Sequence, residues 1–379
     1  MKGTQFKMHI KEVIKKIDIW LILIMGMLTS IGILAINSAT LYAQDPTSLR
    51  KQIIFFVIGL VLMIFVMCFD YHVLANMYLF IYAAVVLILL AVLLFGKNVN
   101  GAKRWIDLGF FQLQPGEFAK IGLILCNAAL INKYNKKLNQ LWPVLIIGIF
   151  ELVPFVLVFS QPNLSTSIVL IVILVIQLFV SKLNMKYIVT AASIAIVIVV
   201  TAFVYIVNTP DQKIIKEYQR DRIMSLVNGG DSSADKYQTE RAVQAIGSGG
   251  LYGKGLNNGS ISRLNYLPES HNDFVMAVVG EELGFVGVLC VIALFLAFIF
   301  RGLWIARGAP DDLGKFIVIG YFGMIAMQCF VNMGVVTDFL PNTGIPIPFV
   351  SYGGSSLWAN LMGLGLVLNV AMHSEQKMF

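Results

Sequence analysis

Ten long apolar runs, separated by polar connections, constrain this 379-residue chain more than any other feature of its sequence. Hydrophobic residues make up 58% of the chain and charged residues only 13%, which excludes an ordinary soluble domain. A transmembrane helix needs about 20 apolar residues to cross the hydrocarbon core. The sequence therefore predicts an all-α integral membrane protein with ten spans, whose cores are residues 19–36, 53–69, 73–94, 118–131, 141–159, 166–180, 187–207, 274–300, 316–336 and 356–370.

One connection is much longer than the others. Residues 208–272 form a polar segment between the seventh and eighth spans. We expect a single membrane domain over residues 1–379, with this segment as a large ordered loop outside the bilayer.

The positions of the lysines and arginines predict the orientation of the chain, because cytoplasmic loops carry an excess of these residues. Counted alternately from a cytoplasmic N-terminus, fourteen basic residues of the short loops and termini fall on the same side: Lys2, Lys7, Lys11, Lys15, Lys16, Lys133, Lys136, Lys137, Lys182, Lys186, Arg301, Arg307, Lys315 and Lys377. Both termini are therefore predicted to be cytoplasmic, and the 208–272 loop extracellular.

The first apolar run and the net charge fit the same topology. The run is longer than the apolar region of a signal peptide and is followed by only a weak cleavage site, so we expect a retained helix. The net charge of +7 then reflects topology and contact with anionic lipid headgroups. The sequence contains no zinc module or basic-aromatic stripe, so nucleic acid is not an expected partner.

The four cysteines fall inside predicted spans, without a CxxC pair or neighbouring histidines: Cys68, Cys126, Cys290 and Cys329. This pattern is typical of buried, inert thiols.

An acidic cluster marks the boundary between the long loop and the eighth span. It contains Glu269, Asp273, Glu281 and Glu282, with His271 beside Asp273. Ionisable groups at membrane depth are candidates for a functional site, because hydrocarbon does not solvate them. Glu281 and Glu282 lie about 12 to 14 Å from Asp273 along a helix, so we expect them to cap or to pair with a cation on another span.

Two further polar constellations fall on the same predicted side. Residues 98–106 lead into 114–120, where Glu117 and Lys120 share a helix face. A substrate role for this pair and an internal ion pair that orients the helix are equally consistent with the spacing. Residues 161–166 read as a turn and helix cap, which would start a helix whatever the function.

The long loop and the last connection complete the set. The glycine-rich residues 245–255 include Lys254, and either a flexible turn or contact with a diphosphate would explain them; their spacing does not match a P-loop. Residues 340–356 contain three prolines and Ser351, which favours an extended path that lines a cavity.

Four of these motifs together resemble the signatures of the SEDS family, named for shape, elongation, division and sporulation. They are Gln-Pro-Gly-Glu at 114–117, the segment 245–255, Leu-Pro-Glu-Ser-His-Asn-Asp at 267–273 with Gly-Glu-Glu-Leu-Gly at 280–284, and the segment 344–356. The resemblance spans nearly the whole chain. Short termini and the Gly-Ile-Pro-Ile-Pro run are more similar to the RodA branch than to the FtsW branch.

The resemblance implies a peptidoglycan glycosyltransferase of the bacterial cytoplasmic membrane, which polymerises lipid II at the outer face and releases undecaprenyl diphosphate. It implies that Asp273 is catalytic, and a partly desolvated carboxylate suits a general base that deprotonates the acceptor 4-hydroxyl. We expect the substrate to contact Glu269, His271, Glu117 and Ser351 and the cations Arg104, Lys120, Arg222 and Lys254.

A partner and a cation complete the expectation. The resemblance implies a class B penicillin-binding protein, a transpeptidase, as partner. A divalent cation such as Mg²⁺ or Mn²⁺ could accompany the diphosphate, although no ligand set in the sequence demands it. Two alternatives stay open at this stage, namely a lipid II flippase and a non-catalytic scaffold for the transpeptidase.

The chain departs from the family pattern at four positions near these motifs. Asn163 stands where the family commonly has aspartate, Ser165 where it has glycine, Gly116 where it has serine, and Asn272 where it has threonine. Asn163 cannot carry a charge, so an electrostatic role for an aspartate there does not transfer to this chain.

Overall fold

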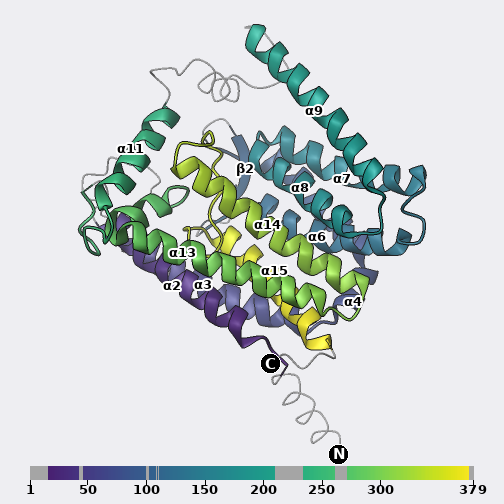
Figure 1. Ribbon diagram of the computed structural model, residues 1–379, viewed down its shortest axis with the longest axis horizontal. Coiled ribbons are helices and arrows are strands. Elements are labelled where there is room, and N and C mark those ends of the chain that lie inside the picture. The colour runs from purple at the N-terminus through teal and green to yellow at the C-terminus, as the bar shows by residue number, and fades with distance from the viewer. Residues whose placement is uncertain are drawn as a thin grey trace, which may run out of the picture.

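The computed structural model describes residues 16–41, 46–99, 102–107, 109, 111–209, 234–260 and 271–374. Long helices form one bundle in which most of them run side by side (Figure 1). The helices are α2 (Ile19–Leu41), α3 (Pro46–Met67), α4 (Tyr71–Asn76), α5 (Tyr78–Phe95), α6 (Pro115–Tyr134), α7 (Leu141–Ser160), α8 (Leu164–Val180), α9 (Met185–Asn208), α11 (Ala234–Gly249), α13 (Val275–Arg307), α14 (Asp312–Val336) and α15 (Gly354–His373).

Each of the ten predicted spans coincides with a helix of the structure, namely α2, α3, α5, α6, α7, α8, α9, α13, α14 and α15. Within the described residues, seven of them are long and apolar enough to cross a membrane. These seven show a multi-pass membrane protein. The number of ten crossings stays a prediction.

The structure is mostly helical, as predicted, and differs from the prediction in two details. The third predicted span is interrupted at Met77, which separates the short helix α4 from α5. A small antiparallel sheet, absent from the all-α prediction, follows α5 and consists of β1 (Lys97–Val99), β2 (Ala102–Asp107) and β3 (Gln112–Leu113). The sheet was missed because β1 and β3 have only three and two residues, and the six residues of β2 do not alternate between apolar and polar.

Local chemistry explains where several helices begin. Pro115 occupies the first turn of α6, where its missing N–H costs no hydrogen bond, and Glu117 faces the positive end of the helix dipole. The side chain of Asn163 caps α8 by accepting from the Thr166 backbone N–H at 3.3 Å. Asp311 caps α14 in the same way through Gly314, at 2.7 Å.

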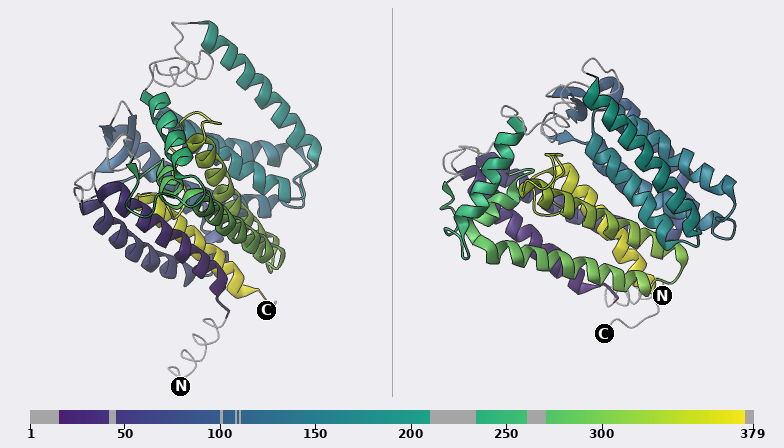
Figure 2. Two further views of the ribbon diagram at one scale, coloured as in Figure 1. Left: turned by 60° about the vertical axis from the view of Figure 1, so that its left-hand side comes forward. Right: turned by 45° about the horizontal axis from the view of Figure 1, so that its top comes forward.

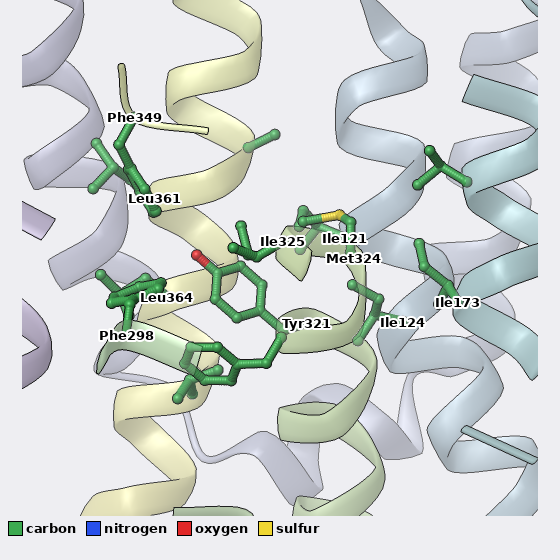
Figure 3. Close-up of a cluster of buried hydrophobic side chains, with 14 of the residues drawn as sticks. Ile121, Ile124, Ile173, Phe298, Tyr321, Met324, Ile325, Phe349, Leu361 and Leu364 are labelled. Carbon is green, nitrogen blue, oxygen red and sulfur yellow. The ribbon is translucent and has the colours of Figure 1, made fainter. Parts of the chain in front are cut away.

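The core lies between α6, α13, α14 and α15. Tyr321 of α14 points toward α15, where its hydroxyl donates to the Asn360 carbonyl at 2.9 Å (Figure 3). Gly363 permits this contact, because a Cβ there would lie 2.5 Å from the Tyr321 ring. Helices associate in lipid by close packing at small residues, because an apolar side chain gains little when it moves from contact with lipid to contact with another helix.

The helices place both termini of the described chain at one end of the bundle (Figure 2). That end also carries the connections α6–α7, α8–α9 and α13–α14. The sheet, the α14–α15 connection and the start of α13 lie at the opposite end. Helix α9 lies at the edge of the bundle and packs against α8.

Candidate active site

Asp273 lies in the turn that precedes α13, and its side chain is half-buried. Its backbone carbonyl accepts a hydrogen bond of 2.8 Å from the side-chain amide of Asn332 on α14. The same amide donates to the carbonyl of Ile345 at 2.9 Å. Asn332 is 1% exposed, and its two hydrogen bonds tie the turn to the α14–α15 connection.

The carboxylate of Asp273 lies beside a glycine of that connection. Gly344 has φ +68°, and a Cβ on it would lie 3.4 Å from Asp273 Oδ2. A residue without a side chain therefore keeps one side of the carboxylate accessible while the backbone approaches closely.

His271 joins the same two segments. Its backbone carbonyl accepts from the Tyr352 N–H at 2.9 Å, and the two rings meet edge to face with centroids 5.2 Å apart. The structure thus brings His271 and Asp273 against the same α14–α15 connection. The role of His271 in a substrate site stays a prediction.

Ser351 is buried within the α14–α15 connection. Its hydroxyl oxygen accepts from the Ile347 N–H at 3.0 Å. From the other side, Gln52 of α3 donates to the Ser351 carbonyl at 3.3 Å and accepts from the Gly353 N–H at 3.2 Å. These contacts satisfy backbone and hydroxyl groups of an irregular, buried segment, which would otherwise lose their hydrogen bonds to water. Direct contact of Ser351 with substrate stays a prediction.

Glu117 and Lys120 form an ion pair in the first turns of α6. Lys120 Nζ lies 2.9 and 2.8 Å from the two Glu117 carboxylate oxygens, and both side chains are at least 96% buried. The pair neutralises itself, so the geometry favours the orienting role over contact with substrate.

Arg104 reaches the turn before α8. It lies on β2, is half-buried, and donates from Nη2 to the Pro162 carbonyl. The next turn of that segment contacts the site, because the Ser165 hydroxyl donates to the Thr343 carbonyl. The start of α8 therefore links Arg104, which contacts Pro162, to Thr343, which precedes Gly344.

Two of the departures from the family pattern lie against each other. A Cβ on Gly116 would meet Thr166 Cγ2 at 3.4 Å and Asn163 Nδ2 at 3.8 Å. The serine and the aspartate of the family pattern would therefore be neighbours here. In this chain the pair is glycine and asparagine, and Asn163 serves as the cap of α8.

The glycine-rich segment completes a broken helix. Gly284 interrupts α13 with φ +68°, so the N–H groups of Phe285 and Val286 do not donate four residues back. They donate to the carbonyls of Gly250 and Leu251 at 2.9 and 3.1 Å. In return, the carbonyls of Glu281 and Glu282 accept from the N–H groups of the next loop residues, Lys254 and Gly255, both at 3.0 Å.

These hydrogen bonds between residues 250–255 and α13 explain the glycines of the segment without invoking a bound phosphate. A Cβ on Gly249 or Gly253 would overlap the carbonyls of Gly280 or Glu282, so only glycine allows the approach. The N–H groups of Lys254 and Gly255, which a phosphate cradle would need, are already donated to α13.

The Lys254 ammonium is also engaged. It lies 2.7 Å from Glu281 Oε1 and 2.7 Å from the Ser260 hydroxyl. Glu281 is 1% exposed, so this lysine offsets a buried carboxylate. Glu282 accepts from the hydroxyl of Ser38 on α2. These contacts fit the structural role expected for Glu281 and Glu282. The cation that pairs with Glu281 is Lys254, which comes from the loop and not from another span.

Glu269 and Arg222 fall outside the described residues. Among the residues that the structure does describe, no three histidine, cysteine, aspartate or glutamate side chains converge as metal ligands.

Asn332 and Gln52 were missed in the sequence, although both contact the site backbone. Each is an amide side chain inside or beside a predicted span, and polar residues in such positions usually bind to something within the bundle. That signal shows that the two amides make polar contacts but does not identify the partners. Asn332 contacts Asp273, which is 59 residues away in sequence, and Gln52 contacts Ser351, which is 299 residues away.

Residues 14–376 match the FtsW/RodA/SpoVE model, described as cell cycle proteins. The chain is 37% identical over 365 residues to the peptidoglycan glycosyltransferase MrdB of Escherichia coli (strain K12), covering 96% of this chain and 95% of that protein. It is 34% identical over 371 residues to stage V sporulation protein E of Bacillus subtilis (strain 168), covering 94% and 98%.

Solved structures agree. The chain is similar, with a TM-score of 0.79 and 28% identity, to a chain of a peptidoglycan synthase complex that coordinates polymerization and crosslinking, covering 94% of this chain and 97% of that one. It is similar to the rod shape determining protein RodA of Thermus thermophilus with a TM-score of 0.69 and 27% identity, covering 95% and 98%.

Proposed function

The chain belongs to the FtsW/RodA/SpoVE family of cell cycle proteins, and we propose that Asp273 is the general base of its glycosyl transfer. Its relatives over nearly the whole length are peptidoglycan glycosyltransferases, and that is the activity of this chain. The reaction joins glycan units in cell-wall synthesis. Lipid II as the substrate and the details of the mechanism are part of the proposal.

The observation that carries the assignment is the double anchoring of the Asp273 turn. Asn332 holds the Asp273 carbonyl and Tyr352 holds the His271 carbonyl. A carboxylate on a turn fixed at two points keeps its orientation, which a general base needs if it is to meet one particular hydroxyl.

In the proposed step, the Asp273 carboxylate takes the proton of the acceptor 4-hydroxyl. The hydroxyl oxygen attacks the anomeric carbon of the donor as the bond from that carbon to the diphosphate breaks. Undecaprenyl diphosphate leaves with the electron pair of the broken bond, and the configuration inverts to give a β-1,4 linkage. Because the diphosphate is already a good leaving group, no second carboxylate is needed as an acid.

Cationic groups are proposed to stabilise charge on the diphosphate. Among the described residues, Arg104 is a candidate because it contacts the Pro162 carbonyl, and Ser165 of the same segment contacts the Thr343 carbonyl of the α14–α15 connection. Arg222 is a candidate from the sequence. Lys120 and Lys254 each hold a buried glutamate, so we assign them to the architecture of the site.

A divalent cation such as Mg²⁺ or Mn²⁺ is proposed to bind chiefly through phosphate oxygens of the substrate. Its role would be that of a charge clamp on the diphosphate, whose oxygens are the hard ligands that such cations prefer. A chelator should then slow polymerisation, and added Mg²⁺ or Mn²⁺ should restore it.

Orientation and partner follow from charge and from the relatives. We propose that the end with the α6–α7, α8–α9 and α13–α14 connections faces the cytoplasm, because that end carries the larger share of the short-loop lysines and arginines. The opposite end, with Asp273, would then face outward. A class B penicillin-binding transpeptidase is the proposed partner, supported by similarity to a chain of a synthase complex that couples polymerization to crosslinking.

The test is polymerisation of labelled lipid II by the purified protein with its transpeptidase partner in detergent micelles. Micelles have no second leaflet, so a flippase could produce no signal and a scaffold would add no polymer. We expect glycan strands that depend on this chain. Absence of polymer from a folded, partner-bound and cation-supplied protein would overturn the proposal.

A further inference from the structure

The end of the bundle opposite Asp273 carries a basic pocket that the glycosyl transfer does not use. The pocket has a volume of about 530 Å³ and lies where α6 ends, α7 begins and the α8–α9 connection passes. Helix α6 has 20 residues, so the pocket lies about 30 Å along its axis from the Gln-Pro motif at its start. Its lining includes four lysines and one aspartate: Lys133, Lys136, Lys137, Lys182 and Asp312.

The pocket is held in shape by contacts among its own elements. Asn139 donates to the Lys182 carbonyl at 3.2 Å and accepts from the Asn184 N–H at 2.7 Å, which joins the α6–α7 and α8–α9 connections. Asn135 donates to Asp312 Oδ2 at 2.6 Å and so adds the start of α14. The lysines are therefore presented by a fixed frame.

The lone aspartate does not balance the lysines. Asp312 accepts from Asn135 and lies 3.4 Å from Lys182. Lys136 and Lys137 are exposed and form no ion pair with another described residue. Lys133 has a neutral partner, the Tyr78 hydroxyl at 3.2 Å. The pocket keeps a net positive charge that an anion would neutralise.

An apolar stripe continues from the pocket along α7. Trp142 lines the pocket, is 44% exposed, and packs edge to face on Tyr134 with ring centroids 5.0 Å apart. Leu141, Leu145 and Ile149 follow at helical spacing and are 61%, 54% and 63% exposed. Tryptophan and lysine at the end of a lipid-facing helix are typical of the headgroup level of a bilayer.

We propose that this pocket binds the phosphate headgroup of an anionic phospholipid, with the acyl chains lying along the exposed stripe of α7. The lysines match the charge of a phosphodiester, and basic pockets between helices bind such headgroups. The stripe distinguishes a lipid from free phosphate, which would have no use for an apolar surface. It also favours a lipid over an acidic peptide, which would need polar contacts beyond the lysines.

The test compares lipid retention by two matched variants in native mass spectrometry. Lys133→Gln/Lys136→Gln/Lys137→Gln removes three charges from the pocket. Lys186→Gln/Arg307→Gln/Lys315→Gln removes three charges from the same end of the bundle but outside the pocket. We expect the pocket variant to bind phosphatidylglycerol roughly tenfold or more weakly than wild type, and the control to stay within about twofold. Phosphatidylcholine with the same acyl chains should bind all three proteins alike.

A second measurement locates the lipid and does not depend on a stability change. The fluorescence of Trp142 is the difference between the fluorescence of wild type and that of a Trp142→Phe variant. Phosphatidylglycerol with brominated chains should quench this Trp142 fluorescence in wild type but not in the pocket variant. Melting temperatures without added lipid establish that both triple variants fold.

Three results would overturn the proposal. They are equal binding of phosphatidylglycerol by pocket and control variants, displacement of the lipid by millimolar inorganic phosphate, or lysine-dependent binding of an acidic peptide with no preference for anionic lipid.

Discussion

The side-chain amide of Asn332 donates to the backbone carbonyls of both Asp273 and Ile345, at 2.8 and 2.9 Å. One buried residue of α14 therefore fixes the distance between the proposed base and the connection that passes beside it. The relationship predicts that catalysis depends on a side chain that need not touch the substrate.

Asn332→Leu removes both hydrogen bonds and leaves two carbonyls without this donor. We expect a loss of about 1–3 kcal/mol in stability and a fall of tenfold or more in polymerisation rate. The matched control is Asn369→Leu, because Asn369 on α15 also bonds two backbone groups, those of Tyr71 and Met67, at 2.9 and 2.7 Å at the opposite end. The control should lose stability but keep its rate when both are assayed well below their melting temperatures. Equal losses of rate would contradict a positioning role for Asn332.

Gly344→Ala tests the close approach of backbone to the carboxylate. The new methyl group would lie 3.4 Å from Asp273 Oδ2, at a residue with φ +68°. We expect a strain of about 1–2 kcal/mol together with a clear loss of rate. Gly250→Ala imposes comparable strain, since Gly250 has φ +57°, but its Cβ would meet nothing within 4 Å. If both alanine variants polymerise equally well, the space beside Asp273 is not used by the acceptor.

Lys254→Gln separates an architectural lysine from one that contacts the diphosphate. The change leaves the buried Glu281 carboxylate without its ion pair, so we expect lower stability and lower activity. Adding Glu281→Gln removes the uncompensated charge and should restore most of both quantities, because an amide oxygen can still accept from Ser260. A double variant that is stable yet inactive would contradict the architectural role and would indicate that Lys254 contacts the diphosphate.

His72 predicts a pH dependence of stability at the opposite end of the molecule. Burial alone would lower the pKa of His72, but its contacts with Asp70 at 2.8 Å and Asp311 at 2.6 Å raise the pKa above the ordinary value of 6.5. A raised pKa means that the folded state holds the proton more tightly, so this stabilisation is complete below about pH 6.5 and is lost as the pH rises through the raised value.

The side chain of His72 is 46% exposed, so solvent screening limits the effect to at most about 1 kcal/mol. Thermal unfolding at about pH 6 and about pH 9 should show wild type losing more stability than His72→Gln. An identical pH dependence in the variant would contradict the assignment.

The sequence predicted the helices well because each carries its own signal. Apolar length identified the spans, and Pro115 and Asn163 mark helix starts by chemistry that acts within one turn. Asp273 became the candidate for the catalytic residue because a carboxylate at the edge of an apolar run is costly unless it has a role.

What could not be predicted depends on residues that are distant in sequence. The break at Gly284 gives α13 two free N–H groups and two free carbonyls, and only the folded structure shows that residues 250–255 satisfy them. Without that partner, a glycine-rich segment with a lysine resembles a phosphate site. Asn332 likewise reads as one polar residue in a span until packing places it 2.8 Å from the Asp273 carbonyl.

The most direct test is gel-resolved polymerisation of labelled lipid II by wild type and Asp273→Asn, each with the transpeptidase partner bound. Asp338→Asn serves as the control, because it makes the same change at an exposed carboxylate just after α14. We expect polymer from wild type and from Asp338→Asn, and none from an Asp273→Asn protein that still folds and binds its partner. Polymer from Asp273→Asn at the wild-type rate would contradict the assignment of Asp273 as the general base.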